Sequence, residues 1–220
     1  MLPLGWLLAT PCPLCRKLPP RSEVSGTVFC LVCEQRLQLP GEGLRGQLPL
    51  PWWSSGNYGG PLREVLLELK RQPRAELVSA LLQPLQPSLA ALAAPGSGPA
   101  PLLVPIPSWK RQGNPLPPQI CRCLGRQLGL RQAPLLERSH PVLVQHRLHR
   151  RLRLANQEGA FRCQPAGDRR RRRPVLIVDD ILTTGATALN GALCLKAAGW
   201  PVLGVVCLAR TPPRQVPKGL

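Results

Sequence analysis

The segment from Val175 to Thr187, VLIVDDILTTGAT, joins an apolar run to a pair of acids and a polar turn. Its first four residues predict a short strand that is buried on both faces. Asp179 and Asp180 stand at the C-terminal end of that strand, and the turn then opens a predicted helix. Ligands of open α/β sheets bind at the carboxyl ends of the strands, so the segment predicts a binding site.

The turn has the composition of a phosphate-binding turn. Small residues let backbone N–H groups approach an anion, the helix N-terminus favours negative charge, and threonine hydroxyls can donate to the same phosphate. Asp179 and Asp180 can accept hydrogen bonds from sugar hydroxyls or help to hold a Mg²⁺ ion. A site that binds a phosphate beside a diol suits a ribose 5-phosphate. The residues of the turn are Thr183, Thr184, Gly185, Ala186 and Thr187.

Other kinds of protein also end a strand in acids. P-loop ATPases do so, but this chain contains no G-x-x-x-x-G-K-S/T segment. Response-regulator domains pair acids at strand ends without a Thr-Thr-Gly-x-Thr turn, and a capped turn with solvated acids would need neither two adjacent acids nor three threonines. The segment resembles the signature of phosphoribosyltransferases nearly residue for residue. This resemblance implies that Asp179 and Asp180 position the ribose of phosphoribosyl pyrophosphate and that the turn binds its 5-phosphate.

The rest of the chain predicts an α/β fold. Short apolar runs bounded by turn residues predict buried strands, and apolar residues at helical spacing predict helices. Strands that are apolar throughout and alternate with helices indicate a mostly parallel sheet flanked by helices. The 220 residues suffice for one medium domain with a small appendage. We predict strands at 102–106, 175–178 and 202–208, and helices at 61–70, 74–92, 118–128 and 187–198.

Two C-x-x-C pairs near the N-terminus are separated by 14 residues. Four thiolates with this spacing can close tetrahedrally on Zn²⁺. Two disulfides are disfavoured in a chain in which we find no export signal, and redox C-x-x-C motifs are rarely doubled at this spacing. We therefore predict a structural zinc site formed by Cys12, Cys15, Cys30 and Cys33.

Several further segments resemble the ComF family in their order along the chain. They are the stretch from Tyr58 to Arg63 with Lys70 downstream, the VPIP run at 104–107, and the stretch from Gln145 to Phe161. The resemblance implies a type I phosphoribosyltransferase fold with an N-terminal zinc ribbon. We divide the chain accordingly into a zinc-ribbon domain at 1–45 and a phosphoribosyltransferase-like domain at 50–220.

The same resemblance implies a reaction, the displacement of pyrophosphate from C1 of the ribose in the presence of Mg²⁺. Lys110 or Arg111 would then meet the pyrophosphate, and Asp179 and Asp180 would be the catalytic residues. The loop at 108–114 is shorter than the family's basic loop and lacks the aromatic residue that the family has there. The sequence therefore supports binding of the ligand more strongly than turnover, and it does not identify an acceptor.

The formal net charge of +18 favours anionic partners. Arg147, Arg150 and Arg153 are spaced to lie near one helix face, where they can line a groove for single-stranded nucleic acid or for pyrophosphate. Aromatic residues that would stack bases are nearly absent nearby, and we interpret the arginine run at 169–173 as a solvated loop. The alternative function is thus a non-catalytic nucleic-acid-binding or adaptor protein.

The cellular setting follows from the same observations. ComF proteins are associated with DNA uptake in natural competence, where a helicase and a DNA-processing protein are the implied partners. No apolar run is long enough to span a membrane. Together with the lack of an export signal, this predicts a cytoplasmic protein.

Overall fold

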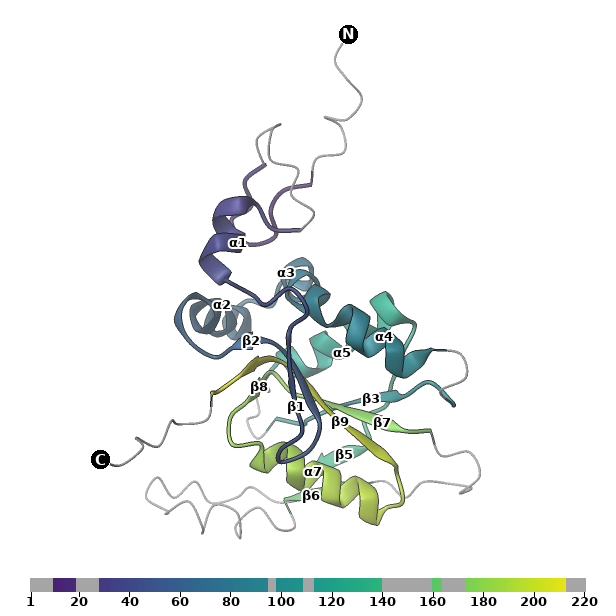
Figure 1. Cartoon of the computed structure of the whole chain (residues 1–220). Coiled ribbons are helices and arrows are strands. Elements are labelled where there is room, and N and C mark those ends of the chain that lie inside the picture. The colour runs from purple at the N-terminus through teal and green to yellow at the C-terminus, as the bar shows by residue number, and fades with distance from the viewer. Residues whose placement is uncertain are drawn as a thin grey trace, which may run out of the picture.

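The structure is a computed structural model of the chain and describes residues 10–18, 28–94, 98–108, 113–139, 160–163 and 173–212 (Figure 1). The strands are β1 (Leu44–Gly46), β2 (Trp52–Asn57), β3 (Leu102–Pro105), β4 (Arg131–Gln132), β5 (Leu136–Arg138), β6 (Phe161–Cys163), β7 (Val175–Val178), β8 (Ile181–Leu182) and β9 (Val202–Arg210). The helices are α1 (Leu31–Leu37), α2 (Gly60–Arg71), α3 (Ala75–Leu82), the 3₁₀ helix η2 (Gln83–Leu85), α4 (Gln86–Ala93), α5 (Leu116–Leu128) and α7 (Ala186–Ala197).

A central sheet holds the described strands together in the order β1-β2-β9-β7-β3-β4, with β8 beside β9. The pairings of β9 with β2, β7 and β8 are parallel, as are those of β3 with β7 and β4. Only β1 runs antiparallel to its neighbour among these strands. A separate antiparallel pair, β5 with β6, lies near α7 (Figure 1). The sheet is therefore mostly parallel, as the sequence predicted.

Both faces of the sheet are covered because its central strands are apolar at every position. Alternate residues of a strand point to opposite faces. Leu176 and Val178 of β7 join one buried cluster with α2 to α5, whereas Val175 and Ile177 join a second cluster with α7. Figure 1 shows α3, α4 and α5 on one side of the sheet and α7 on the other.

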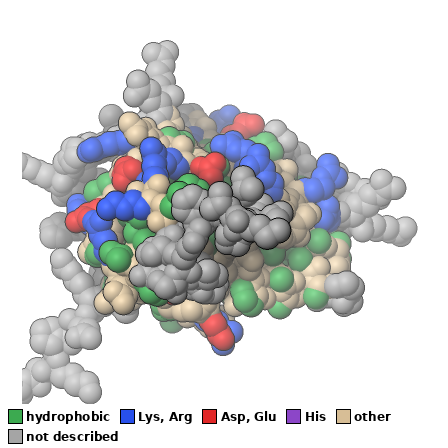
Figure 2. Space-filling view, turned by 90° about the horizontal axis from the view of Figure 1, so that it is seen from above, with side chains coloured by type: hydrophobic (Ala, Val, Ile, Leu, Met, Phe, Trp, Pro, Cys, Tyr) green, Lys and Arg blue, Asp and Glu red, His purple; other side chains and the backbone are tan. Residues whose placement is uncertain are grey.

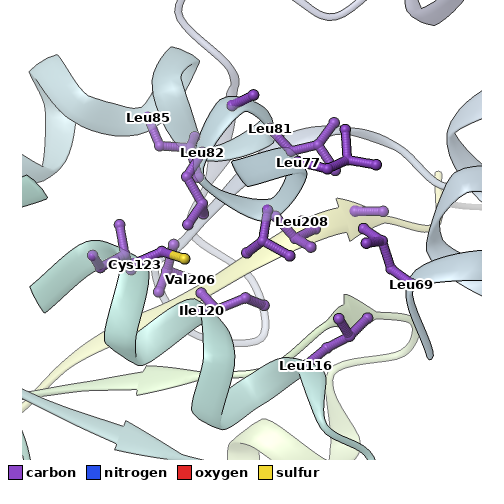
Figure 3. Close-up of a cluster of buried hydrophobic side chains, with 14 of the residues drawn as sticks. Leu69, Leu77, Leu81, Leu82, Leu85, Leu116, Ile120, Cys123, Val206 and Leu208 are labelled. Carbon is purple, nitrogen blue, oxygen red and sulfur yellow. The ribbon is translucent and has the colours of Figure 1, made fainter. Parts of the chain in front are cut away.

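The larger of these clusters is built from leucines of several helices. In Figure 3, side chains of α2, α3 and α5 point toward Val206 and Leu208 of β9. Leu66, Leu69, Leu81 and Leu124 are fully buried here. This packing fixes the helices against the sheet, and through them the loops at the ends of β3 and β7.

Most predicted elements are found within a residue or two of their expected bounds, and the predicted α/β class is confirmed. The helix expected at 74–92 is wrong as a single element, because it divides into α3, η2 and α4. Pro84 lies within η2 and Pro87 in the first turn of α4, and a proline cannot donate the backbone hydrogen bond that a continuous helix needs. Strand β2, which begins at Trp52, was not predicted. The sequence also predicts a partly helical stretch from Val144 to Phe161, which lies outside the described residues as far as residue 159.

Candidate functional site

A crevice opens between the carboxyl ends of β3 and β7. These neighbouring strands lead to helices on opposite faces of the sheet, since α5 packs with the first cluster and α7 with the second. In open α/β sheets such a reversal leaves a crevice for ligands. A cavity of about 440 Å³ lies there. Its described lining consists of Lys70, Ile106, Pro107, Ser108, Gly113, Asn114, Pro115, Pro117, Arg138, Asp179 and Thr187.

Asp179 is the only acid among the described residues that line this cavity. Its Oδ1 accepts the backbone N–H of Asp180 at 2.9 Å. Burial and the neighbouring charge of Asp180 raise the pKa of the Asp179 carboxyl from 3.8 to about 8. Asp179 can therefore both donate and accept a hydrogen bond near neutral pH, which suits a sugar hydroxyl.

Asp180 has different surroundings. It is 5% exposed, and its Oδ2 lies 2.6 Å from Nζ of Lys70, in the last turn of α2. Its Oδ1 accepts the N–H of Ile181 at 2.9 Å, and the side chain of Asn114 also hydrogen-bonds to it. Burial alone would raise the pKa of Asp180, but the hydrogen bond and charge of Lys70, with the bond from Asn114, hold it below its usual range.

Arg138 brings a second cation to the cavity from the end of β5. Its Nε donates to the carbonyl of Pro107 at 2.9 Å, and its guanidinium carbon lies 4.2 Å from the centre of the Phe161 ring. Burial lowers the pKa of Arg138 to about 10, against the opposing effect of Asp179, so it stays protonated at neutral pH. The cavity thus presents two cations beside one acid.

The predicted phosphate-binding turn leads from β8 into α7. Thr183 and Thr184 are exposed, and the hydroxyl of Thr184 accepts the N–H of Ala186 at 3.3 Å. Gly185 is the N-cap of α7 with a left-handed φ of 79°. Arg210, at the end of β9, donates to the carbonyls of Leu182 and Thr183. The turn is therefore anchored from the neighbouring strand, while Thr183 and Thr184 remain exposed.

Replacing Gly185 by alanine is expected to cost about 2–4 kcal/mol of stability. A Cβ there would lie 2.6 Å from Cγ of Pro49, and the positive φ is unfavourable for any side chain. Gly129→Ala is the matched control, because Gly129 has a φ of 67° but nothing within 4 Å of a Cβ. Urea unfolding of both variants separates the two costs. Equal losses of stability in the two variants would show that Pro49 can move away from the new Cβ without a cost in free energy.

The four predicted zinc ligands come together at the N-terminal end. The Sγ atoms of Cys12, Cys15, Cys30 and Cys33 all lie within 4.8 Å of one another. Sγ of Cys15 and Cys30 are 3.7 Å apart, too far for a disulfide and close to the ~3.8 Å edge of a tetrahedron with Zn–S bonds of ~2.3 Å. The cluster is therefore compatible with a structural zinc ion.

Several features tie this cluster to the rest of the chain. The backbone N–H of Cys30 points at Sγ of Cys12 at 3.5 Å. Arg74 donates to the carbonyl of Pro13 at 3.0 Å, within the first C-x-x-C pair, and to Glu68 of α2 at 2.9 Å. Cys12 and Cys33 belong to the same buried cluster as the apolar face of α2. The division into domains at 1–45 and 50–220 remains a prediction.

The structure places the predicted site residues unequally. Asp179 and Thr187 line the cavity. Asp180 is not among the described lining residues and forms an ion pair with Lys70, which is one of them. The other residues of the turn, from Thr183 to Ala186, lie between these two in the sequence and are not among the described residues that line the cavity. Lys110 and Arg111, and the basic residues Arg147, Arg150 and Arg153, lie outside the described residues.

Sequence reasoning did not assign site roles to Lys70, Asn114, Arg138 or Arg210. Lys70 belongs to a segment that resembles the ComF family, so the pattern offered a signal for it, whereas Asn114 ends the loop at 108–114, which departs from the family. Arg138 was one arginine among many in a basic stretch. Its place in the cavity depends on the pairing of β5 with β6, which no local pattern indicates.

Comparison with curated proteins decides the family. DNA utilization protein YhgH of Escherichia coli K12 is 32% identical to this chain over 175 residues, which cover 75% of each protein. The protein of the same name from Salmonella typhimurium is also 32% identical over 175 residues, again 75% of each. The chain belongs to the YhgH family. A scan against protein-family models finds no match.

Solved structures resembling this YhgH-family chain are remote. Adenine phosphoribosyltransferase of Leishmania donovani aligns with 76% of this chain and 75% of its own, at 16% identity and a TM-score of 0.41. That of Trypanosoma brucei, in complex with AMP, pyrophosphate and ribose-5-phosphate, aligns with 80% and 91% at 13% identity and a TM-score of 0.38. In this chain the central sheet is mostly parallel and is covered by helices on both faces, and two acids follow β7. Among the described helices, none has the length and apolar content needed to cross a membrane.

Proposed function

We propose that this YhgH-family chain binds a phosphoribosyl ligand of the phosphoribosyl pyrophosphate type in the crevice between β3 and β7. The observation that carries the proposal is the position of the VLIVDDILTTGAT segment. It puts Asp179 and Thr187 on the lining of a cavity of about 440 Å³ at the reversal point of the sheet. The ribose hydroxyls bind at Asp179, and the 5-phosphate binds at the turn from Thr183 to Thr187.

The cavity also suits the pyrophosphate group of such a ligand, which is the leaving group in a transfer reaction. Lys70 and Arg138 supply two positive charges, and Lys110 or Arg111 would add to them. Transfer would break the C1–O bond with its electron pair leaving on pyrophosphate, while a nucleophile of the acceptor forms the new bond to C1. Preorganised cations stabilise the charge that develops on pyrophosphate. Asp179, once it has lost its proton, would offer a carboxylate oxygen to a Mg²⁺ ion that arrives with the ligand, and such an ion would neutralise phosphate charge.

A structural zinc ion in the four-cysteine cluster belongs to the same proposal. The pKa of the Cys33 thiol lies above its usual range, because it is buried and hydrogen-bonded to the other three cysteines. Zinc binding would therefore release protons from the cluster.

Cytoplasmic location also remains a prediction, as do the helicase and DNA-processing partners implied by the ComF resemblance.

The alternative is a non-catalytic protein that binds single-stranded DNA. Its support is the net charge of +18 and the relatives' name, DNA utilization protein. On the face in Figure 2, however, Lys and Arg side chains are interspersed with Asp and Glu. The described part of that face shows no continuous basic surface, and the arginines predicted for DNA lie outside the described residues.

Titration of phosphoribosyl pyrophosphate with Mg²⁺ tests the proposal. Wild type is expected to bind, and the Asp179→Asn/Asp180→Asn double variant to lose at least tenfold in affinity. The zinc-loaded Glu42→Gln variant serves as a control, since Glu42 is exposed and outside the cavity. Single-stranded DNA is titrated in parallel over a salt series. No binding of the sugar phosphate by wild type, with DNA affinity that falls steeply with salt, would establish the alternative.

A further inference from the structure

The two acids after β7 have unlike roles in the structure. Asp179 lines the cavity, whereas Asp180 is 5% exposed and does not belong to the described lining. Both oxygens of Asp180 are engaged by the protein, one by the backbone of Ile181 at 2.9 Å and the other by Lys70 at 2.6 Å. Asp180 is thus enclosed by groups of the chain itself.

Lys70 is the group through which this buried acid reaches the cavity. It stands in the last turn of α2 and lines the cavity, with its side chain 35% exposed. An ammonium group has three donors, so the bond to Asp180 leaves donors that a ligand oxygen can accept from. An ion pair with one buried partner also fixes where the long lysine side chain ends.

We propose that Lys70, held in position by Asp180, contacts the phosphoribosyl ligand beside Asp179. Asp180 is then a positioning residue, and the two acids do not form a shared site for a divalent cation. A cation bridging both carboxylates would have to displace an ammonium group that lies 2.6 Å from Oδ2 of Asp180. Magnesium that accompanies the ligand would bind the pyrophosphate oxygens and, of the two acids, Asp179 alone. This inference rests on the proposed function for its ligand.

A double-mutant cycle on the affinity for phosphoribosyl pyrophosphate, titrated with Mg²⁺, tests the role of Lys70. Lys70→Met and Asp180→Asn are each expected to weaken binding at least tenfold. Because both substitutions act through the ammonium group of Lys70, their effects should not add. The double variant should bind the ligand no more than about twofold more weakly than whichever single variant has the lower affinity. Lys196→Met, which removes an exposed lysine of α7, should stay within twofold of wild type. Fully additive losses, or normal affinity in Lys70→Met, overturn the proposal.

A second measurement needs no sugar phosphate and no lysine variant. Mn²⁺ alone is titrated into zinc-loaded wild type and Asp180→Asn, and free Mn²⁺ is read by electron paramagnetic resonance. Equal binding by the two proteins supports the proposal, because Lys70 already occupies Asp180. Loss of a Mn²⁺ site in Asp180→Asn overturns it. If wild type does not bind phosphoribosyl pyrophosphate, the proposed function fails, while the Mn²⁺ result still decides whether the acids hold a divalent cation.

Discussion

Loss of zinc from the four-cysteine cluster is expected to lower the thermal unfolding midpoint of the chain by roughly 10 °C or more. The cluster is not an isolated appendage, because Cys12, Phe29, Cys33 and Leu37 are buried with the apolar face of α2. Structural zinc contributes on the order of 10 kcal/mol to small zinc modules. We expect zinc binding to add about 3–5 kcal/mol to the free energy of unfolding of the packed helices. The reason is that Arg74 and the shared buried cluster connect those helices to the cysteines.

Cys15→Ser is the appropriate variant for this test. Cys15 is exposed, so the change removes a ligand with little loss of packing. Cys194→Ser is the matched control, because a serine hydroxyl can replace the thiol that donates to the carbonyl of Phe161. Zinc content by mass spectrometry and the unfolding midpoint are measured together. Zinc loss in Cys15→Ser without a change in the midpoint would contradict the expectation.

Asp179→Asn is expected to make the chain more stable, by on the order of 3 kcal/mol at pH 9. The folded pKa of Asp179 is raised from 3.8 to about 8. The folded chain therefore holds more protons than the unfolded chain between about pH 4 and pH 8, and the wild-type free energy of unfolding falls as the pH rises through that window. Asparagine has no such titration, and its amide oxygen can still accept the N–H of Asp180.

The measurement is urea unfolding of wild type and Asp179→Asn from pH 4 to pH 9. The two curves should separate progressively as the pH rises, with the variant above wild type. Glu42→Gln makes the same carboxylate-to-amide change at an exposed position and should follow wild type throughout. A variant less stable than wild type at pH 9 would show that the charge of Asp179 is compensated. The same variant should bind the sugar phosphate poorly, so stability and binding oppose each other here.

Local patterns were sufficient for the strands β3, β7 and β9 of the sheet and for the position of the acids. The run from Val175 to Val178 is apolar at every position, and the acids must follow it at the carboxyl end. The cysteine spacing likewise predicted a cluster whose geometry is compatible with zinc. These features depend on residues that are near one another in the chain, so the sequence alone reveals them.

The different roles of Asp179 and Asp180 could not be predicted from local sequence patterns. Adjacent residues of an irregular turn can point in different directions, and only the packing of α2 against the sheet brings Lys70 to Asp180. Arg138 reaches the cavity because β5 pairs with β6 across a segment far longer than a hairpin turn. Such contacts are fixed by the tertiary fold, and a single sequence carries no direct signal for them.

The strand order has a consequence for the synthesis of the chain. Strand β9 lies between β2 and β7 in the sheet, although it is made after both. Until β9 has left the ribosome, β2 has only β1 as a neighbour, and the sheet stays in two parts. Parallel pairing between such distant segments is slow and leaves apolar strands exposed in the meantime. A nascent chain therefore cannot complete the crevice until β9 has been made, and it is the unfinished chain that most needs protection from aggregation.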